Sequence, residues 1–342
     1  MSPSSHPTQA ASNPFPYSDT NKRYHTWDYH LKHTFGGKTF KVSLNAGFGC
    51  PNRDGTKGFG GCTYCSASGS GDFAGNPQED MVTQFEKIRN AMLQKWPDAT
   101  RYICYFQAGT NTYAPLAALR EKYEAVLAQP GVVGLSIATR ADCLPEDVVE
   151  YLAQLNRKTY LMVELGLQSV SDETGQRIHR GHTYQEFLDG FWKLHQQGIR
   201  VCVHIINGLP GENRERMLET VQELSHLPLY AIKIHLLHVL PGTAMAEEYA
   251  RGEFSLMTRE EYISVLCDQR EMLPPSVVIQ RLTGDGDRQM LIGPLWSLKK
   301  LVVINEIDKE LFRRGSWQGK RYDGVLLPSP SPDLSKISGE KG

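Results

Sequence analysis

The stretch "LMVELGL", residues 161–167, is a short apolar run interrupted by a single glutamate, and it decides the fold class. Runs of the same kind occur at five other places: 40–45, 101–106, 134–139, 200–206 and 231–239. They are rich in Val and Ile and nearly continuous in apolar character, which is typical of parallel strands covered on both faces. The pattern therefore predicts six parallel strands.

Amphipathic stretches separate these runs and are long enough to form helices: 79–95, 115–128, 145–155, 184–197 and 212–226. Residues 183–186, "TYQE", form a capping box, which marks the start of a helix. Successive strand–helix units predict an α/β fold, a partial (β/α)6 TIM-like barrel. A doubly wound sheet is the competing layout.

The alternation stops after about residue 275, where a strand-like run (277–282) and a helical stretch (297–314) follow. These form a small C-terminal α+β extension in our interpretation. We expect a barrel over residues 23–272, the extension over 273–325, and tails at 1–22 and 326–342. The tails are polar and rich in Pro and Ser, so we expect them to be disordered.

The charge and the cysteine content restrict the class of protein. The 37 Lys+Arg and 38 Asp+Glu residues exclude a globally basic nucleic-acid binder, but they do not exclude a local basic face. The sequence has no apolar run of membrane-spanning length, and its N-terminal stretch lacks the apolar region of a signal peptide. Seven cysteines, an odd number, do not suggest a disulfide framework, so we expect a cytoplasmic protein without a membrane partner.

Three of the cysteines, Cys50, Cys62 and Cys65, lie in a glycine-rich segment, "GFGCPNRDGTKGFGGCTYC" (47–65), directly after the first predicted strand. Catalytic residues of barrel enzymes lie at this carboxyl end of the strands. The other four cysteines are isolated, and Cys104 and Cys202 fall within predicted strands, where a small buried apolar side chain is the usual role.

Three kinds of site could use these thiols. A structural zinc ion needs four ligands, and the fourth would have to come from His25, His30 or His33. A dithiol redox pair at Cys62 and Cys65 would leave Cys50 without a purpose. On a 4Fe–4S cluster, three thiolates bind three irons and leave the fourth iron open for a cofactor or substrate.

The cysteine segment resembles the radical S-adenosylmethionine (SAM) superfamily, in which three cysteines follow the first barrel strand and an aromatic residue precedes the last, as in "CTYC". The common first gap in that superfamily is three residues, and here it is eleven. A longer gap occurs in the branch of the Elongator catalytic subunit, and "CPNRDGTKGFGGCTYC" closely resembles a small bacterial subfamily near that branch.

Further motifs resemble the same branch in the same order, from about residue 23 to about residue 322: "VELGLQS" (163–169), "HRGHT" (179–183), "HIINGLPGE" (204–212), "VLPGT" (239–243), "QRLTGDG" (280–286) and "WSLKKLVVINEIDKELFRRGSWQGKRY" (296–322). The resemblance implies an oxygen-sensitive enzyme that carries a 4Fe–4S cluster and binds SAM at its open iron. An electron from a donor such as flavodoxin or ferredoxin would cleave SAM to methionine and a 5′-deoxyadenosyl radical, which abstracts a hydrogen atom from substrate.

The resemblance also implies residues that bind SAM. Tyr64 would lie against the adenine, with packing under the loop as its alternative role. "QAGTNT" (107–112) occupies the position of a Gly-Gly-Glu motif in relatives but has no Glu, so Gln107 or its neighbours Thr110 and Asn111 would accept from the SAM amino group. Ser136 and Arg140 would contact ribose or carboxylate, and a salt bridge is the alternative for Arg140.

Later strands supply the remaining candidates. Glu164 is a carboxylate in an apolar strand, so it requires a hydroxyl, amino or cationic partner, either on SAM or within the protein. Gln168 could contact SAM or substrate, and Arg180 is our candidate for binding the SAM carboxylate. Gly208 and Gly211 would allow close approach of the backbone to the adenine, although turn glycines look the same.

The C-terminal extension contains a run of basic residues with Trp317 and Tyr322 between them: Lys299, Lys300, Arg313, Arg314, Lys320 and Arg321. They are interpreted either as a solvated helix face or as a patch for a nucleic-acid backbone. Members of the Elongator branch act at the wobble uridine of tRNA, and members of the nearby subfamily are associated with conversion of its 5-carboxymethylaminomethyl side chain towards 5-aminomethyl. The resemblance thus implies a tRNA substrate.

Two other kinds of function also fit the sequence. One is a radical SAM enzyme that acts on a protein or a small metabolite, for which the basic patch would be dispensable. The other is a zinc-binding interaction protein without enzymatic activity.

Overall fold

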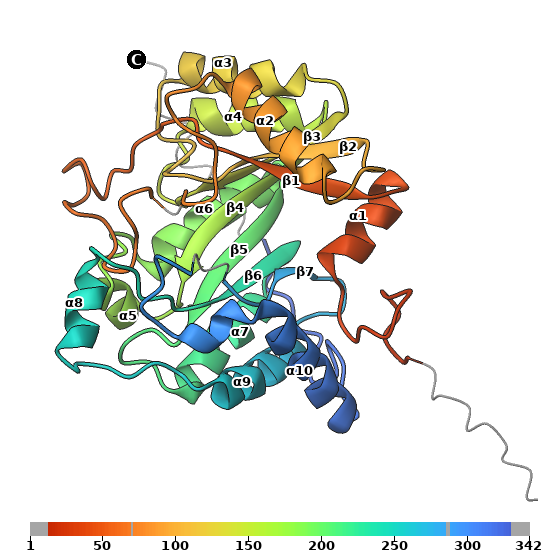
Figure 1. Ribbon diagram of the computed structural model, residues 1–342, viewed down its shortest axis with the longest axis vertical. Coiled ribbons are helices and arrows are strands. Elements are labelled where there is room, and N and C mark those ends of the chain that lie inside the picture. The colour runs from red at the N-terminus through yellow and green to blue at the C-terminus, as the bar shows by residue number, and fades with distance from the viewer. Residues whose placement is uncertain (1–12, 70, 285–287, 330–342) are drawn as a thin grey trace, which may run out of the picture.

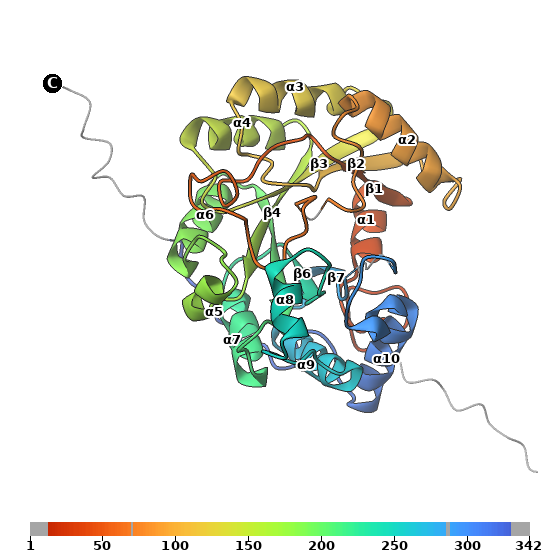
Figure 2. The same ribbon diagram turned by 60° about the vertical axis from the view of Figure 1, so that its left-hand side comes forward.

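A computed structural model describes residues 13–69, 71–284 and 288–329. Its sheet has seven parallel strands in sequential order: β1 (Thr39–Leu44), β2 (Arg101–Phe106), β3 (Val132–Thr139), β4 (Tyr160–Gln168), β5 (Arg200–Asn207), β6 (Ala231–Leu236) and β7 (Val278–Arg281). The sheet curls into a half-barrel with helices outside it (Figures 1 and 2). The predicted partial barrel is confirmed. The doubly wound alternative is wrong, because its strand order would reverse at a switch point.

The last strand differs from the expected layout. Residues 277–282 were expected in a separate extension, but β7 pairs in parallel with β6, with Val278 opposite Ala231. The residues just before the first helix also reach this edge, where Thr26 forms a bridge with Ile279. The half-barrel therefore has one strand more than the six that the sequence predicts.

Helices cover the convex face of the sheet and bury its outward-facing apolar residues. They are α2 (Met81–Leu93), α3 (Leu116–Leu127), α4 (Glu146–Asn156), α6 (Tyr184–Gln196), α7 (Arg214–Ser225) and α9 (Arg259–Met272), with α10 (Lys300–Arg313) packed on α9. Two short helices, α5 (Asp172–Arg177) and α8 (Ala244–Ala250), lie beyond the carboxyl ends of β4 and β6, where Met245 packs in a separate apolar cluster with Ile178. A 3₁₀ turn, η1 (Leu295–Leu298), precedes α10. The predicted capping box is confirmed, since Thr183 and Glu186 bond reciprocally at the start of α6. None of the described helices is both long and apolar enough to cross a lipid bilayer.

The concave side is filled in layers. Its apolar layer lies at the amino ends of the strands and contains buried side chains that include Ile103, Met162 and Cys202. Helix α1 (Trp27–Phe35) closes that end, with Leu31 packed into the same layer. The interior is thus sealed at the amino ends of the strands, and a ligand would have to reach it from the carboxyl ends.

Part of the N-terminal segment that the sequence assigns to a tail packs on the domain. Phe15 is buried, and the ring of Tyr17 stacks on His25 with centroids 4.9 Å apart. The predicted disorder at 1–12 and 330–342 concerns stretches that lie outside the described residues.

Candidate active site

The cysteine segment lies in the long connection between β1 and α2, at the carboxyl ends of the strands. Backbone hydrogen bonds fix it to neighbouring loops: the Thr110 amide donates to Gly49 O at 3.0 Å, and the Thr63 amide donates to Ile178 O at 3.0 Å. These bonds join it to the loop after β2 and to the end of α5. A segment poor in apolar residues is therefore positioned mainly by its polar backbone groups.

One of these contacts requires a glycine. Gly109, in "QAGTNT", has a φ of +72°, and a Cβ atom there would lie 2.4 Å from the carbonyl oxygen of Phe48. Both the left-handed conformation and this close approach exclude a side chain. The sequence reasoning considered this loop only for SAM binding, whereas the structure shows that it also supports the cysteine segment.

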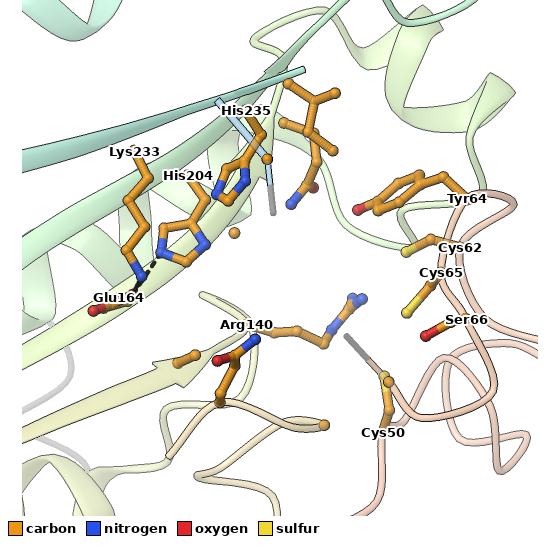
Figure 3. A pocket seen from close by; sticks show the side chains of 18 of the residues that line it. Cys50, Cys62, Tyr64, Cys65, Ser66, Arg140, Glu164, His204, Lys233 and His235 are labelled. Atoms are coloured by element: carbon orange, nitrogen blue, oxygen red, sulfur yellow. Dashed lines mark hydrogen bonds and ion pairs between the residues drawn. The ribbon is translucent and has the colours of Figure 1, made fainter. Parts of the chain in front are cut away.

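The exposure of the cysteines separates three of them from the rest. Cys50, Cys62 and Cys65 are partly exposed, and all three line a cavity of about 310 Å³, within the range of small-molecule sites. The other four cysteines are buried, as expected for Cys104 and Cys202. Figure 3 shows the three labelled thiols on one wall of the cavity, facing Arg140.

The zinc alternative does not fit this arrangement. His25 and His30 lie at the opposite end of the barrel, where His25 Nδ1 contacts Ser276 O and His30 Nε2 contacts the Tyr230 hydroxyl. Among the described residues, the one group of possible metal ligands whose atoms all lie within 4.8 Å of one another is Glu164, Cys202 and His204. The three loop thiols are therefore spread too widely for a single ion, whereas a cluster offers each thiol its own iron.

The environment of the thiols also suits a multi-iron group. Burial first, and then the neighbouring Cys65, raise the pKa of Cys62 to about 11, and a bound metal group would favour its thiolate form. The side-chain amide of Asn52 donates to Cys62 Sγ at 3.6 Å, a contact typical of the second shell around a metal ligand. The donor set therefore fits the iron–sulfur cluster that the sequence predicts.

Two histidines in the cavity have buried ring nitrogens without partners. They are His182, at both Nδ1 and Nε2, and His235, at Nε2, counted over the residues that the structure describes. Buried polar atoms are nearly always hydrogen-bonded in folded proteins. Their unpaired state indicates that a polar ligand completes the cavity. Neither histidine was a site candidate from the sequence.

The predicted SAM-binding residues divide into two groups. Tyr64, Gln107, Arg140, Glu164, Gln168 and Arg180 line the cavity. Ser136 is buried below it and donates to Glu164, while Gly208 and Gly211 have left-handed φ values but do not line the cavity. Nothing in their positions supports the predicted contacts of Gly208 and Gly211 with adenine.

Arg180 has a structural role. It is 1% exposed, and its guanidinium donates to backbone oxygens of Leu167, Ser169 and His182 as well as to the Asp172 carboxylate at 2.9 Å. These contacts use four of its five N–H groups, so it lacks the free two-donor fork that would bind a carboxylate. Arg180 therefore holds the loop after β4 in place.

Arg140 forms the salt bridge that was its alternative role. Its Nε and Nη2 donate to Asp142 at 2.9 and 2.8 Å, and its Nη1 donates to Arg180 O at 2.6 Å. Its guanidinium nevertheless points towards the cysteines in Figure 3. The Asp142 pair thus fixes a positive charge opposite the thiols.

Tyr64 and Gln168 lie on the cavity wall in different ways. Tyr64 packs against an apolar cluster that includes Ile178 and Leu209, the alternative role that we considered for it. Gln168 has a φ of +66°, which is uncommon for a residue other than glycine, and its side chain makes no hydrogen bond among the described residues. A strained backbone that presents an unused amide to a cavity is typical of a binding position.

A charged layer lies below the cavity, and the sequence reasoning identified only part of it. Glu164 is fully buried and forms ion pairs with Lys41 and Lys233; His204 Nε2 donates to it at 2.7 Å. Burial alone would raise the pKa of Glu164, but the two lysines and His204 hold it well below its usual value. The predicted need for a partner is confirmed, and the partners lie within the protein (Figure 3).

The predicted basic patch is divided between the two ends of α10. Lys299 and Lys300 lie at its start, just after Gly293, which pairs with Val239 beyond the carboxyl end of β6. Four residues lie at or beyond its other end: Arg313, Arg314, Lys320 and Arg321. There Gln318 donates to Val277 O at 2.8 Å, next to the amino end of β7.

Acidic side chains offset much of this charge. Arg313 pairs with Glu310 at 2.7 Å, and Arg314 pairs with Asp268 at 2.7 Å. The six basic residues therefore do not form a single continuous patch. Residues that are close in sequence lie at opposite ends of a helix that runs along the barrel.

Comparison with known proteins agrees with this geometry. The family model described as "Radical SAM superfamily" matches residues 44–224, and the one described as "Radical_SAM C-terminal domain" matches residues 229–313. The uncharacterized protein YtqA of Bacillus subtilis is 56% identical over 311 residues, which cover 91% of this chain and 96% of that protein.

Two further matches are more distant. The tRNA uridine(34) acetyltransferase of Methanocaldococcus infernus is 30% identical over 156 residues, covering 45% of this chain and 29% of that protein. A solved structure of Elp3 from the same archaeon shares the fold, with a TM-score of 0.62 and 19% identity over 85% of this chain and 68% of that one. The half-barrel, the three cavity cysteines and the match over more than half of the chain lead to one conclusion: this protein belongs to the radical SAM superfamily of enzymes.

Proposed function

We propose that this enzyme modifies the side chain of the wobble uridine in tRNA, converting 5-carboxymethylaminomethyl towards 5-aminomethyl. The observation that carries the chemistry is the set of three partly exposed cysteines on one wall of a cavity that opens at the carboxyl ends of the strands. A partial similarity to a tRNA uridine(34) acetyltransferase supports the substrate class.

In this proposal Cys50, Cys62 and Cys65 hold a 4Fe–4S cluster whose open iron binds SAM. When bound, the cluster and SAM would supply the acceptor of a hydrogen atom from the methylene between the amine and the carboxylate, and the oxidised cluster would accept one further electron from the substrate radical. The resulting imine would be hydrolysed by water to release glyoxylate and leave the 5-aminomethyl group. The chain positions the reactants: Gln107 and Gln168 offer amide groups to SAM from the ends of β2 and β4. Arg140 provides fixed positive charge, and Tyr64 closes the cavity beside the loop.

Two exposed aromatic side chains near the cysteines support binding of an unstacked base. Phe59 is 83% exposed on the cysteine segment, and Phe73 is 52% exposed and lines the cavity. Single-stranded RNA bases commonly stack on such side chains, and the anticodon presents its wobble base in a loop. The basic residues of α10 are divided between its two ends, so they offer no continuous surface for an RNA backbone. We therefore expect the RNA to be recognised at the rim of the cavity.

The test has two parts. After anaerobic reconstitution, the protein is expected to show the absorption and electron paramagnetic resonance of a 4Fe–4S cluster and to cleave SAM with dithionite or with reduced flavodoxin or ferredoxin. The variant Cys62→Ala should lose both properties. Cys267→Ala, which removes a buried thiol from α9, should retain them. A colourless protein that retains zinc would contradict the proposed chemistry.

The substrate is tested by mass spectrometry of tRNA nucleosides from a strain that lacks the protein. We expect 5-carboxymethylaminomethyluridine to accumulate and the 5-aminomethyl product to decrease. Wild type should restore the product and Cys62→Ala should not. An unchanged nucleoside profile, together with retained SAM cleavage, would instead indicate a protein or small-molecule substrate.

A further inference from the structure

Below the cavity, the residues that the structure describes include more buried positive than negative charge. Among them the partly buried Lys41 and the buried Lys233 share one counter-charge, the carboxylate of Glu164. Burial and Lys233 lower the pKa of His204 to about 4, so this histidine is neutral at neutral pH and adds no charge. An excess cation with little access to water is costly unless an anion is bound nearby.

The two lysines are not equivalent. The Lys41 ammonium donates to Glu164, to Ser136 Oγ at 3.1 Å and to Gln280 Oε1 at 2.8 Å, which uses all three of its N–H groups. The Lys233 ammonium donates to Glu164 and to the Tyr105 hydroxyl at 3.0 Å, so among the described residues one of its N–H groups remains unused. Lys233 also lines the cavity, and Lys41 does not.

A second cation lies next to Lys233. Arg281 ends β7 directly opposite Lys233 in the register of the sheet, and both side chains line the cavity. Like charges opposite one another on neighbouring strands repel. The unpaired Nε2 of His235 lies on the same wall, and the His204 and His235 ring centroids are 5.3 Å apart.

We infer that Lys233 and Arg281, with His235 beside them, bind a carboxylate group of the substrate at the inner end of the cavity. This inference rests on the proposed function, whose substrate side chain ends in a carboxylate. It adds that the enzyme selects its substrate by this charge. The cysteine wall lies across the cavity from Lys233 (Figure 3), so a carboxylate held here would place the adjoining carbon between the two walls.

The test uses a small probe that needs no RNA. N-Benzylglycine carries an aromatic ring, a methylene, an amine, a second methylene and a carboxylate in the order of the proposed side chain; N-benzylglycinamide is its uncharged counterpart. Binding is measured by calorimetry on the cluster-loaded protein without reductant, with and without SAM. We expect the acid to bind at least about tenfold more tightly than the amide, as charge-assisted hydrogen bonds imply.

Variants that remove a positive charge and a variant that removes a negative charge should change the binding of the acid in opposite directions. This contrast distinguishes the loss of a binding site from general destabilisation of the fold. Lys233→Met and Arg281→Met should each remove most of the preference for the acid, while Glu164→Gln should strengthen acid binding because it removes the competing anion. The matched control is Lys158→Met, which removes an exposed lysine from the loop before β4 and should change nothing. Thermal unfolding of each variant shows whether it is folded.

Several results would overturn the inference: equal affinity for acid and amide, no binding of either probe at millimolar concentration, an unchanged preference in Lys233→Met, or competitive displacement of the acid by SAM. The last would assign the cations to the carboxylate of the cofactor. These outcomes are independent of the tRNA nucleoside profile. A failed carboxylate site and a failed tRNA assignment can thus be distinguished.

Discussion

The side-chain amide of Asn52 donates to Cys62 Sγ at 3.6 Å and also to the backbone carbonyl of His179. One short side chain therefore connects a proposed cluster ligand to the loop after α5. Gly181 makes room for it, since a Cβ at that position would lie 2.6 Å from Asn52 Oδ1.

Replacement of Asn52 by Ala is expected to lower the reduction potential of the reconstituted cluster by tens of millivolts, because a hydrogen bond to sulfur stabilises the reduced form. Spectroelectrochemical titration measures this shift. Asn76→Ala, in the same long connection but outside the cavity, is the matched control. A potential unchanged from wild type would contradict a role for the Asn52 contact.

Alanine substitutions at Gly109 and Gly211 together test whether the loop after β2 supports the cysteine segment. Both have left-handed φ values, but a Cβ would meet Phe48 O at 2.4 Å in the first and nothing within 4 Å in the second. Gly211→Ala should therefore cost about 1 kcal/mol of unfolding free energy from backbone strain alone. Gly109→Ala should cost about 3 kcal/mol and reduce iron retention. Urea denaturation and iron content give the comparison, and equal effects would contradict it.

Arg180→Met should destabilise the protein without removing a SAM contact. It removes four hydrogen bonds, although Leu167 O keeps the Ser169 amide and Asp172 keeps the Tyr184 amide as donors. We therefore expect the free energy of unfolding to fall by about 3 kcal/mol. SAM affinity, measured at a temperature where the variant is folded, should change little. Arg177→Met removes an exposed pair with Glu248 and should cost less than about 1 kcal/mol. A large loss of SAM affinity at full stability would restore the carboxylate-binding role.

Stability should decrease as the pH falls from 6.5 to about 4. Burial, followed by nearby positive charge, lowers the pKa of both His204 and His30 from 6.5 to about 4. Between these values the unfolded chain binds protons that the folded chain does not, so acidification favours unfolding, and below about 4 no further stability is lost from these two groups. For His204 the loss is roughly 3 kcal/mol.

Chemical denaturation of the cluster-free protein across this pH range measures the effect. His204→Asn and His30→Asn should each make the decrease shallower. His179→Asn, at an exposed position away from both residues, should leave it unchanged. A flat profile in wild type would show that these histidines gain protons without unfolding the chain.

Much of the fold could be predicted because parallel strands covered on both faces have a simple local signature. The runs at 101–106 and 200–206 correspond closely to β2 and β5. The position of β7 could not be predicted in the same way, because it depends on pairing between segments far apart in the sequence. Four residues between two loops carry too little pattern to distinguish a seventh barrel strand from an extension.

The site was predictable where residue type alone restricts the chemistry. Three cysteines after the first strand predicted a shared site at the carboxyl ends of the strands, and a glutamate in an apolar strand predicted a buried partner. Lys41 and Lys233 carry the same signal, since each interrupts an apolar strand. The role of Arg180 depends on where loop carbonyls lie in space, and the charge on α10 depends on which barrel end each residue faces. Neither is encoded by local sequence.

Helix α1 closes the half-barrel at the amino ends of the strands. In the proposed reaction, SAM, its cleavage products and the modified substrate would all pass through the opening at the carboxyl ends of the strands. The products are consequently expected to be released in a fixed order, and the molecule bound furthest from the opening dissociates last. A cavity with a single opening therefore predicts strong inhibition by the product that dissociates most slowly.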